Sequence, residues 1–140
     1  MTSMTTEEKQ QFLAGLHVGI VAIPEADRGP LCVPVWYDYR PGEELWFITG
    51  PESRKGRLLR EGLRISLCAQ TETPPYRYVS VEGPIMALDA AREELLPMAV
   101  RYLGEEMGRA YVSGSEAGTD VVVRVRPERW LAVDYGKRGA

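Results

Sequence analysis

The chain has 140 residues, of which 44% are hydrophobic and 26% are charged, and its formal net charge is −3. This length and composition predict one folded domain, residues 1–140, rather than a disordered chain. The acidic balance argues against general nucleic-acid binding, and no segment approaches the about 20 apolar residues of a membrane helix. The polar start of the chain is unlike a secretory signal, so we expect a cytoplasmic protein.

The first 16 residues predict a short helix. Thr5 or Thr6 can cap it, because glutamates follow in the first turn in a capping-box pattern. The helix should end near Gly15. Three apolar residues can share one face of this helix: Phe12, Leu13 and Leu16.

Seven later segments are rich in β-branched and aromatic residues and predict strands, at 17–24, 29–39, 44–50, 63–70, 76–88, 119–127 and 130–135. Pro41 and Gly42 favour a hairpin between the second and third of them. Most connections are too short for parallel crossovers. We therefore expect a mainly β fold, a six- to seven-stranded antiparallel sheet that closes into a β-barrel.

Two helical segments interrupt the strands. Ser53 can cap a helix over 54–62 that Gly62 ends. A second helical pattern starts with Asp89 as its N-cap, and Pro97 should break or kink it. The second piece would reach about Met107, and 114–118 would be a flexible link to the next strand.

The predicted strands contain features that favour an interface. Pro34 lies in mid-strand and cannot donate to a ladder, so that strand should be an edge, bulged or facing something other than a neighbour. Trp36 and Tyr37 point to opposite sides, so one large aromatic should be partly exposed. The fifth strand alternates an apolar face with an outer face of aromatic and polar residues, suited to a second subunit, to a ligand, or to an ordinary barrel exterior.

The remaining reactive side chains predict no catalytic or metal centre. Cys32 and Cys68 are far apart in apolar strands and are interpreted as two small core residues, with neither a disulfide nor a zinc site. His17 stands alone at a strand start, where a solvent or core role is favoured over acid–base chemistry. Glu82 is expected to pair with an arginine such as Arg77 or Arg124.

Cations gather where the third strand leads into the predicted helix at 54–62. Arg54, Lys55 and Arg57 fall in its first turn, the end where the helix dipole disfavours positive charge. A bound anion would reverse that sign. Backbone amides and the hydroxyls of Thr49 and Ser53 could join these cations around a phosphate. The alternative is a set of solvated surface cations, and Arg60 and Arg64, further along, can be only that.

The stretch LWFITGPESRKGRLLREGLRISL resembles the strand–loop–helix–strand signature of the pyridoxamine 5′-phosphate oxidase-like superfamily of FMN-binding split β-barrels. The segments GPLCVPVWYDYRPGEELWF and YRYVSVEGPI fall in the family's order. The closing RPERWLAVDYGK is similar to the flavin/deazaflavin oxidoreductase branch, many of whose members use the deazaflavin F420. The resemblance implies a homodimer with two cofactors in grooves between the subunits.

The resemblance also implies roles for individual residues. Lys55, with Arg57 and the Ser53–Arg54 pair, would hold the cofactor phosphate, and Thr49 would lie beside it. The ring system would be lined by three residues of the second strand: Pro34, Val35 and Trp36. The other subunit would close the groove with Tyr76, Arg77 and Tyr78. Near the C-terminus, Trp130 and Tyr135 would stack near the ring or the substrate.

The implied activity is that of an oxidoreductase that transfers a hydride between F420 and a small conjugated organic acceptor. An FMN-binding reductase or oxidase, and a non-catalytic flavin-binding module, stay open as alternatives. Oxidation of vitamin B6 is disfavoured, because the family's substrate-phosphate residues near the C-terminus are not found here. Leu58 and Leu59 stand where F420-using relatives often carry Asn, whereas Arg60 or Arg64 would suit the polyglutamate tail of F420.

Overall fold

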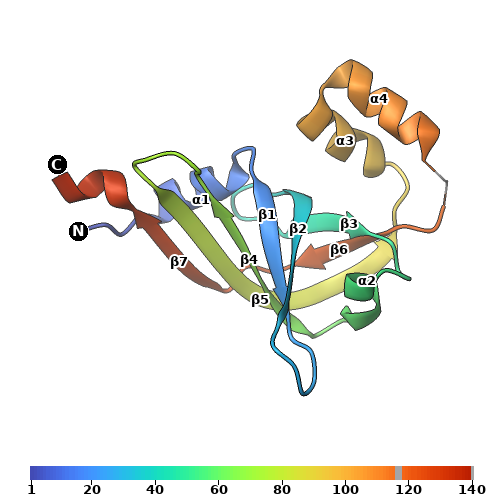
Figure 1. The fold of residues 1–140 in the computed structure, drawn as a ribbon, viewed down its shortest axis with the longest axis horizontal. Helices are drawn as coiled ribbons and strands as arrows, with labels where there is room; N and C mark the ends of the chain where they lie inside the picture. Colours follow the sequence, from blue (N-terminus) through green and yellow to red (C-terminus); the bar gives the residue numbers. More distant parts are fainter. Residues whose placement is uncertain (116–117, 140) are drawn as a thin grey trace.

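The computed structural model describes residues 1–115 and 118–139 (Figure 1). The described residues form seven strands: β1 Val18–Ile23, β2 Leu31–Asp38, β3 Leu45–Thr49, β4 Arg64–Gln70, β5 Arg77–Ala90, β6 Val121–Val125 and β7 Arg129–Asp134. The helices are α1 Thr6–Ala14, α2 Arg54–Leu58, α3 Leu95–Leu103, α4 Glu105–Gly114 and the 3₁₀ helix η1 Tyr135–Gly139. All seven predicted strands are confirmed. The link predicted at 114–118 includes residues 116 and 117, which lie outside the described residues.

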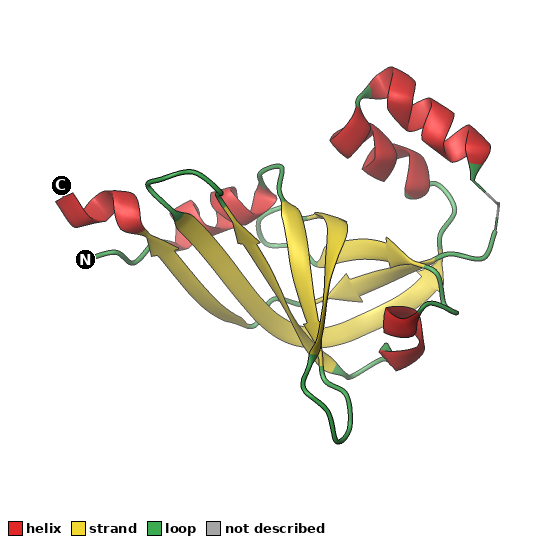
Figure 2. Cartoon of the chain, viewed as in Figure 1, coloured by secondary structure: helices red, strands yellow, loops and turns green. Residues whose placement is uncertain are grey.

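The sheet is antiparallel and closes on itself. The strands follow the order β4-β1-β2-β3-β6-β5-β7. β4 also pairs with β5, and this additional pairing closes the first six strands of that order into a ring. The long strand β5 makes this possible, because it pairs with β4 along one part and with β6 along another. β7 adds to β5 outside the ring (Figure 2). The predicted mainly β, antiparallel barrel is confirmed.

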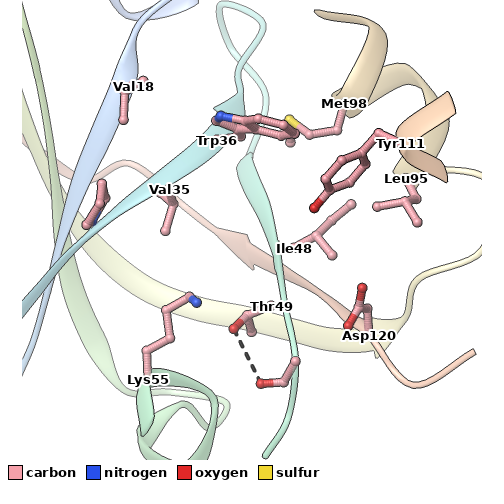
Figure 3. A pocket seen from close by; sticks show the side chains of 12 residues that line it. Val18, Val35, Trp36, Ile48, Thr49, Lys55, Leu95, Met98, Tyr111 and Asp120 are labelled. Carbon is pink, nitrogen blue, oxygen red and sulfur yellow. Dashed lines mark hydrogen bonds between the residues drawn. The ribbon is translucent and has the colours of Figure 1, made fainter. Parts of the chain in front are cut away.

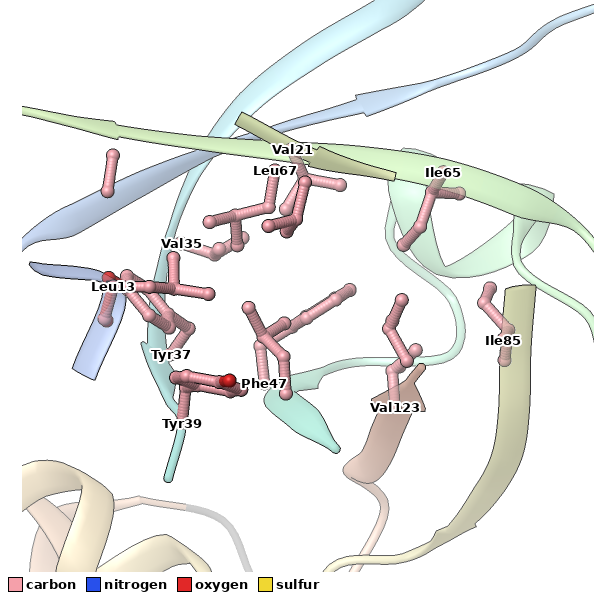
Figure 4. Close-up of a cluster of buried hydrophobic side chains, with 14 of the residues drawn as sticks. Leu13, Val21, Val35, Tyr37, Tyr39, Phe47, Ile65, Leu67, Ile85 and Val123 are labelled. Carbon is pink, nitrogen blue, oxygen red and sulfur yellow. Dashed lines mark hydrogen bonds between the residues drawn. The ribbon is translucent and has the colours of Figure 1, made fainter. Parts of the chain in front are cut away.

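The barrel interior is filled by every second residue of the strands, the ones that face inward. Tyr37, Phe47 and Leu13 are among the largest fully buried side chains (Figure 4). Leu13 comes from α1, whose capping box is formed by Thr5 and Glu8. The Tyr37 hydroxyl donates a 2.6 Å hydrogen bond to the carbonyl of Leu13, which ties α1 to β2. Burial raises the pKa of the Tyr37 hydroxyl, so this donor keeps its proton.

Three helix predictions were wrong in their bounds. Asp89 caps no helix, because β5 continues to Ala90 and Asp89 stands opposite Val122 of β6. The helices after it are divided at Gly104, with φ 86°, and not at Pro97, which sits in the first turn of α3, where its missing N–H is tolerated. α4 runs on to Gly114, past Met107.

One of the first two helices is shorter than predicted. α2 ends at Leu58, and Leu59 is already extended, so Gly62 is not its end. α1 ends at Ala14 with Gly15 as its C-cap, as predicted, and Leu16 beyond it is 59% exposed.

Pro34 marks the place where the barrel is split. β2 pairs with β1 along six residues, and Pro34 stands opposite Ile20. With β3, however, β2 pairs only at Tyr37 and Asp38. Pro34 therefore lies on a stretch with one neighbour, as predicted.

The two cysteines lie on strands but outside the fully buried core. Cys32 is exposed on β2 and Cys68 is half-buried, so the interpretation of both as core residues was wrong. Both thiols are free, and burial raises the pKa of Cys68. Among the described residues, no helix has the length and apolar character needed to cross a membrane.

Candidate functional site

A cleft of about 540 Å³ opens beside the split in the barrel (Figure 3). The strands β2 and β3 form its floor, and the helix pair α3–α4 and α2 form its walls. Its lining is apolar and aromatic, with one cationic and one anionic side chain: Val18, Pro34, Val35, Trp36, Ile48, Thr49, Gly50, Lys55, Leu95, Met98, Tyr111 and Asp120.

Lys55 is the cation of the cleft. It lies on α2, it is half-buried, and its ammonium group points into the cleft (Figure 3). None of the acidic side chains in the described residues lies within salt-bridge distance of it, although these residues form nine ion pairs elsewhere. A half-buried ammonium without a counter-ion favours the binding of an anion.

The turn between β3 and α2 fixes the position of Lys55. The Ser53 hydroxyl accepts from the amide of Gly56 at 3.1 Å and donates to the carbonyl of Gly50 at 2.8 Å. Thr49 is buried, and its hydroxyl lies 3.2 Å from that of Ser53. Gly56 is required, because a Cβ there would clash with the Gly50 carbonyl oxygen. The two hydroxyls thus stabilise the turn itself.

The other cations of the predicted cluster point elsewhere. Arg54 forms a 2.8 Å salt bridge with Glu25, and Arg57, 69% exposed in its side chain, lies 3.6 Å from Glu52. Arg64 is bound by Glu82 and Glu128, both at 2.7 Å, and Arg60 is exposed. Of the five cations, Lys55 alone lines the cleft.

Trp36 provides a flat apolar wall. Its ring stacks on Tyr102 of α3, with centroids 5.1 Å apart and planes 6° apart, and it meets Tyr111 of α4 at 5.5 Å. Val35 and Pro34 continue the same stretch of β2 along the cleft. The residues predicted to line a ring system are therefore together in one cleft with Lys55.

The helix pair is held to the barrel by two side chains of α3. Arg101 donates to the carbonyls of Tyr37, Ala14 and Gly15 at 2.9–3.2 Å. The Tyr102 hydroxyl donates to the carbonyl of His17 at 2.6 Å and accepts from the amide of Tyr37 at 3.0 Å. Burial raises the pKa of Tyr102, so this hydroxyl stays a donor and keeps the wall of the cleft in place.

Asp120 is a lining residue that the sequence analysis missed. It precedes β6, whose Val121 pairs with Thr49, so the antiparallel register sets Asp120 opposite Gly50. Its carboxylate lies 3.7 Å from where a Cβ of residue 50 would be. Little in the sequence singles out Asp120, because it is one of 20 acidic residues and lies at the end of a loop.

Five residues that the resemblance placed around the cofactor do not line this cleft. Tyr76, Arg77 and Tyr78 lie at the start of β5, beside β7, with the Arg77 guanidinium over the ring of Phe12. Trp130 of β7 packs edge-on against Tyr39 and does not line the cleft. Tyr135, 40% exposed, is outside the lining as well. Within one chain these residues and Lys55 are not brought together.

Two further polar residues have structural partners. His17 stacks on Phe12 and its Nε2 lies 3.0 Å from that residue's carbonyl oxygen, and burial lowers the pKa of the imidazole. Glu82 pairs with an arginine, as predicted, but its partner is Arg64 and not one of the two named as examples, Arg77 or Arg124. Both roles are structural.

A match to a known family covers nearly the whole chain. The family model described as pyridoxamine 5′-phosphate oxidase matches residues 5–134. The chain belongs to the pyridoxamine 5′-phosphate oxidase family. This confirms the resemblance found in the sequence. A comparison with curated proteins gives no match.

Solved structures of similar proteins share the fold of this family member. The conserved hypothetical protein Rv2991 from Mycobacterium tuberculosis is 26% identical, over 99% of this chain and 90% of its own, with a TM-score of 0.78. An F420 reductase is 20% identical, over 87% and 94% of the two chains, with a TM-score of 0.61. An FAD binding protein from Mycobacterium smegmatis is 14% identical, over 94% and 97%, with a TM-score of 0.62.

Proposed function

We propose that this protein binds the deazaflavin F420 and transfers a hydride between it and a small conjugated organic acceptor. The observation that carries the proposal is the ammonium group of Lys55, which shares one cleft with the flat ring of Trp36. A phosphorylated ring compound needs both a cation for its phosphate and a flat apolar wall for its ring. The F420 reductase and the FAD binding protein of similar fold support a cofactor of this class.

The residues of the cleft would bind and orient the cofactor. Lys55 would hold the phosphate, with the Thr49–Ser53 turn fixing its position. Pro34, Val35 and Trp36 would lie along the ring and exclude water from it. When bound, F420 supplies the hydride chemistry, so the protein itself needs no acid–base pair for that step.

Arg54 and Arg57 would contribute at longer range. Both are exposed and their partners, Glu25 and Glu52, are carboxylates that a phosphate could replace. Exposed ion pairs of this kind are worth about 0–1 kcal/mol, so an arginine could leave its partner at little cost. This keeps both residues in the proposed phosphate site, behind Lys55.

A second candidate cofactor is FMN. F420 carries several negative charges in its polyglutamate tail, whereas FMN carries only its phosphate. Lys55 is the one cation lining the cleft among the described residues, which matches the smaller charge of FMN. The alternatives are then an FMN-dependent reductase or oxidase, or a non-catalytic flavin-binding module.

We further propose that the active form is a homodimer. The outer face of the sheet exposes apolar side chains, with Ile20 41%, Val18 52% and Leu131 58% exposed. The strand register aligns Ile20 of β1 with Cys68, Ser80 and Leu131 across four neighbouring strands. Val18 also lines the cleft, so a second copy covering this face would reach the cleft rim.

The partner copy would complete the cofactor site. It would contribute its own copies of three residues that do not line the cleft of their own chain: Tyr76, Arg77 and Tyr78. Light scattering on the intact protein should give twice the chain mass. Leu131→Glu should lower that mass and weaken cofactor binding together, whereas Met107→Glu, at an exposed position of α4, should change neither.

Titration of the purified protein with F420 and with FMN tests the function most simply. We expect saturable quenching of cofactor fluorescence, with tighter binding of F420. Reduced F420 with quinone acceptors should then be oxidised only when the protein is present. Binding without turnover would favour the non-catalytic module, tighter FMN binding would favour the flavin enzyme, and binding of neither would refute the proposal.

A further inference from the structure

Asp120 gives the cleft a second polar end. Its side chain comes from the segment just before β6, and in the cleft it lies on the far side of Thr49 from Lys55 (Figure 3). Lys55 and Asp120 do not form an ion pair with each other. Neither residue takes part in any of the ion pairs of the described residues. The cleft is therefore bipolar, with a cation at one end and an anion at the other.

The described residues provide no donor for the Asp120 carboxylate. Its own backbone carbonyl accepts from the amide of Ala91, which fixes the start of β6 beside the end of β5. The side chain, in contrast, faces apolar neighbours of the lining, Ile48 and Leu95, and the ring of Tyr111 (Figure 3). A half-buried carboxylate beside apolar groups is unfavourable until a donor reaches it.

We propose that Asp120 is a specificity-determining residue that accepts a hydrogen bond from the imide N–H of the cofactor ring. The assignment rests on the proposed function, because it assumes that the phosphate of the same molecule is held by Lys55. It adds to that function a selection rule: the ligand must carry an anion at one end and an N–H donor at the other.

The chemistry of the two candidate cofactors supports the imide. The oxidised rings of FMN and of F420 share one ring N–H, at the pyrimidine edge. In both, the sugar-like chain and its hydroxyls lie between the ring and the phosphate, on the Lys55 side of the molecule. The pyrimidine edge is therefore the donor-bearing group that both cofactors share at a distance from the phosphate, and Asp120 lies in the same way at a distance from Lys55 in the cleft.

A carboxylate at this place also excludes ligands. An acceptor group at the distal end, such as a second carboxylate or phosphate, would face Asp120 and be repelled. Donor recognition by a charged acceptor discriminates strongly, because an N-methylated ligand loses the bond and leaves the carboxylate without a donor. This discrimination can be measured by binding, without turnover.

The experiment compares FMN and F420 with their N3-methylated forms, by fluorescence titration of the intact protein. For wild type, we expect methylation to weaken binding by about ten- to a hundredfold, the effect of one charge-assisted hydrogen bond. In Asp120→Ala the ratio of the affinity for the unmethylated cofactor to that for its methylated form should fall to about one. Asp120→Asn, which keeps the shape and one acceptor oxygen, should give an intermediate ratio. Asp89→Asn, an exposed aspartate on β5 that is outside the lining, is the matched control and should keep the wild-type ratio.

The outcomes separate this assignment from the proposed function. If a cofactor binds but wild type and Asp120→Ala show the same ratio, the proposed function stands and the role of Asp120 is overturned. A methyl group that meets some other part of the cleft would give that result. If neither FMN nor F420 binds, the proposed function fails and this assignment fails with it. Thermal unfolding of each variant verifies that it is folded.

Discussion

Arg101 and Lys55 are two half-buried cations on helices that border the same strand pair, and the chain uses them in opposite ways. Arg101 donates to three backbone carbonyls and lies 3.5 Å from Asp38. Lys55 has no salt-bridge partner in the described part of the chain and points into a cleft. The first arrangement stabilises the fold, and the second leaves positive charge available to a ligand.

This comparison separates stability from function along the molecule. Around Arg101, α3 is joined to α1 and β2, and the buried polar side-chain atoms of the described residues all have hydrogen-bond partners. Lys55 and Asp120, in contrast, face the cleft, and neither forms an ion pair among the described residues. Groups that a fold leaves unpaired in a concave site are candidates for ligand binding.

The largest expected effect is on the Arg101 side of the comparison. Arg101→Met removes several charge-assisted hydrogen bonds and should lower the free energy of unfolding by about 3 kcal/mol. Because α3 carries the wall of the cleft, ligand affinity should fall as well. Urea unfolding measures the first effect. Arg109→Met, which removes only an exposed ion pair with Glu105, should stay within about 0.5 kcal/mol of wild type, and equal stability of both variants would contradict the comparison.

On the Lys55 side, the expected effect is on binding alone. Lys55→Met should weaken cofactor binding by about 1.5–3 kcal/mol, since it removes one charge-assisted bond to phosphate. The free energy of unfolding should change by less than about 0.5 kcal/mol, because no partner in the described residues is left unpaired.

Arg57→Met is the matched control for Lys55, since it removes a positive charge from the same helix outside the cleft. It should weaken binding less than Lys55→Met. Fluorescence titration and urea unfolding of the two variants check both halves of the prediction. An equal loss of affinity in the two would mean that general positive charge, and not the ammonium of Lys55, attracts the ligand.

A smaller effect is expected at the cap of α1. The Thr5 hydroxyl accepts from the amide of Glu8 at 3.1 Å, so Thr5→Ala should lower the free energy of unfolding by about 1 kcal/mol. Cofactor affinity should not change, because α1 does not line the cleft. Thr6→Ala, one residue further on and without this bond, should be close to neutral in urea unfolding. A comparable loss in both variants would rule out the cap as the cause.

The smallest effect concerns His17. Burial, with Arg77 and Arg101 nearby, holds the pKa of His17 below its ordinary value. A group whose folded pKa is depressed stabilises above its unfolded pKa, about 6.5 for His, and this stability is lost as the pH falls through the folded value. Urea midpoints should therefore decline from pH 8 to pH 5.5. His17→Asn should show a smaller decline over this range, and an unchanged decline would assign the effect to other groups.

Local patterns in the sequence predicted most of the fold. The capping box at Thr5 and the seven strands depend on neighbouring residues, and all were found where expected. Asp89 was misassigned because its surroundings read as a helix start, while pairing with Val122, over 30 positions away, kept it in β5. Long-range pairing of this kind overrides local propensity and has no local signal.

The candidate site was predictable in part. Five cations pointed to the turn after β3, but the partners that occupy them, Glu25 for Arg54 and Glu128 for Arg64, are distant in sequence. Selecting Lys55 from the cluster therefore required the structure. Asp120 enters the site only through the register of β6 against β3, which the sequence does not state.

A crystal structure of the protein grown with F420 or FMN tests the central claim most directly. The account predicts cofactor density in the cleft beside Trp36, with a phosphate oxygen within salt-bridge distance of the Lys55 ammonium. Density for the cofactor elsewhere on the molecule, or a phosphate held without Lys55, would contradict it.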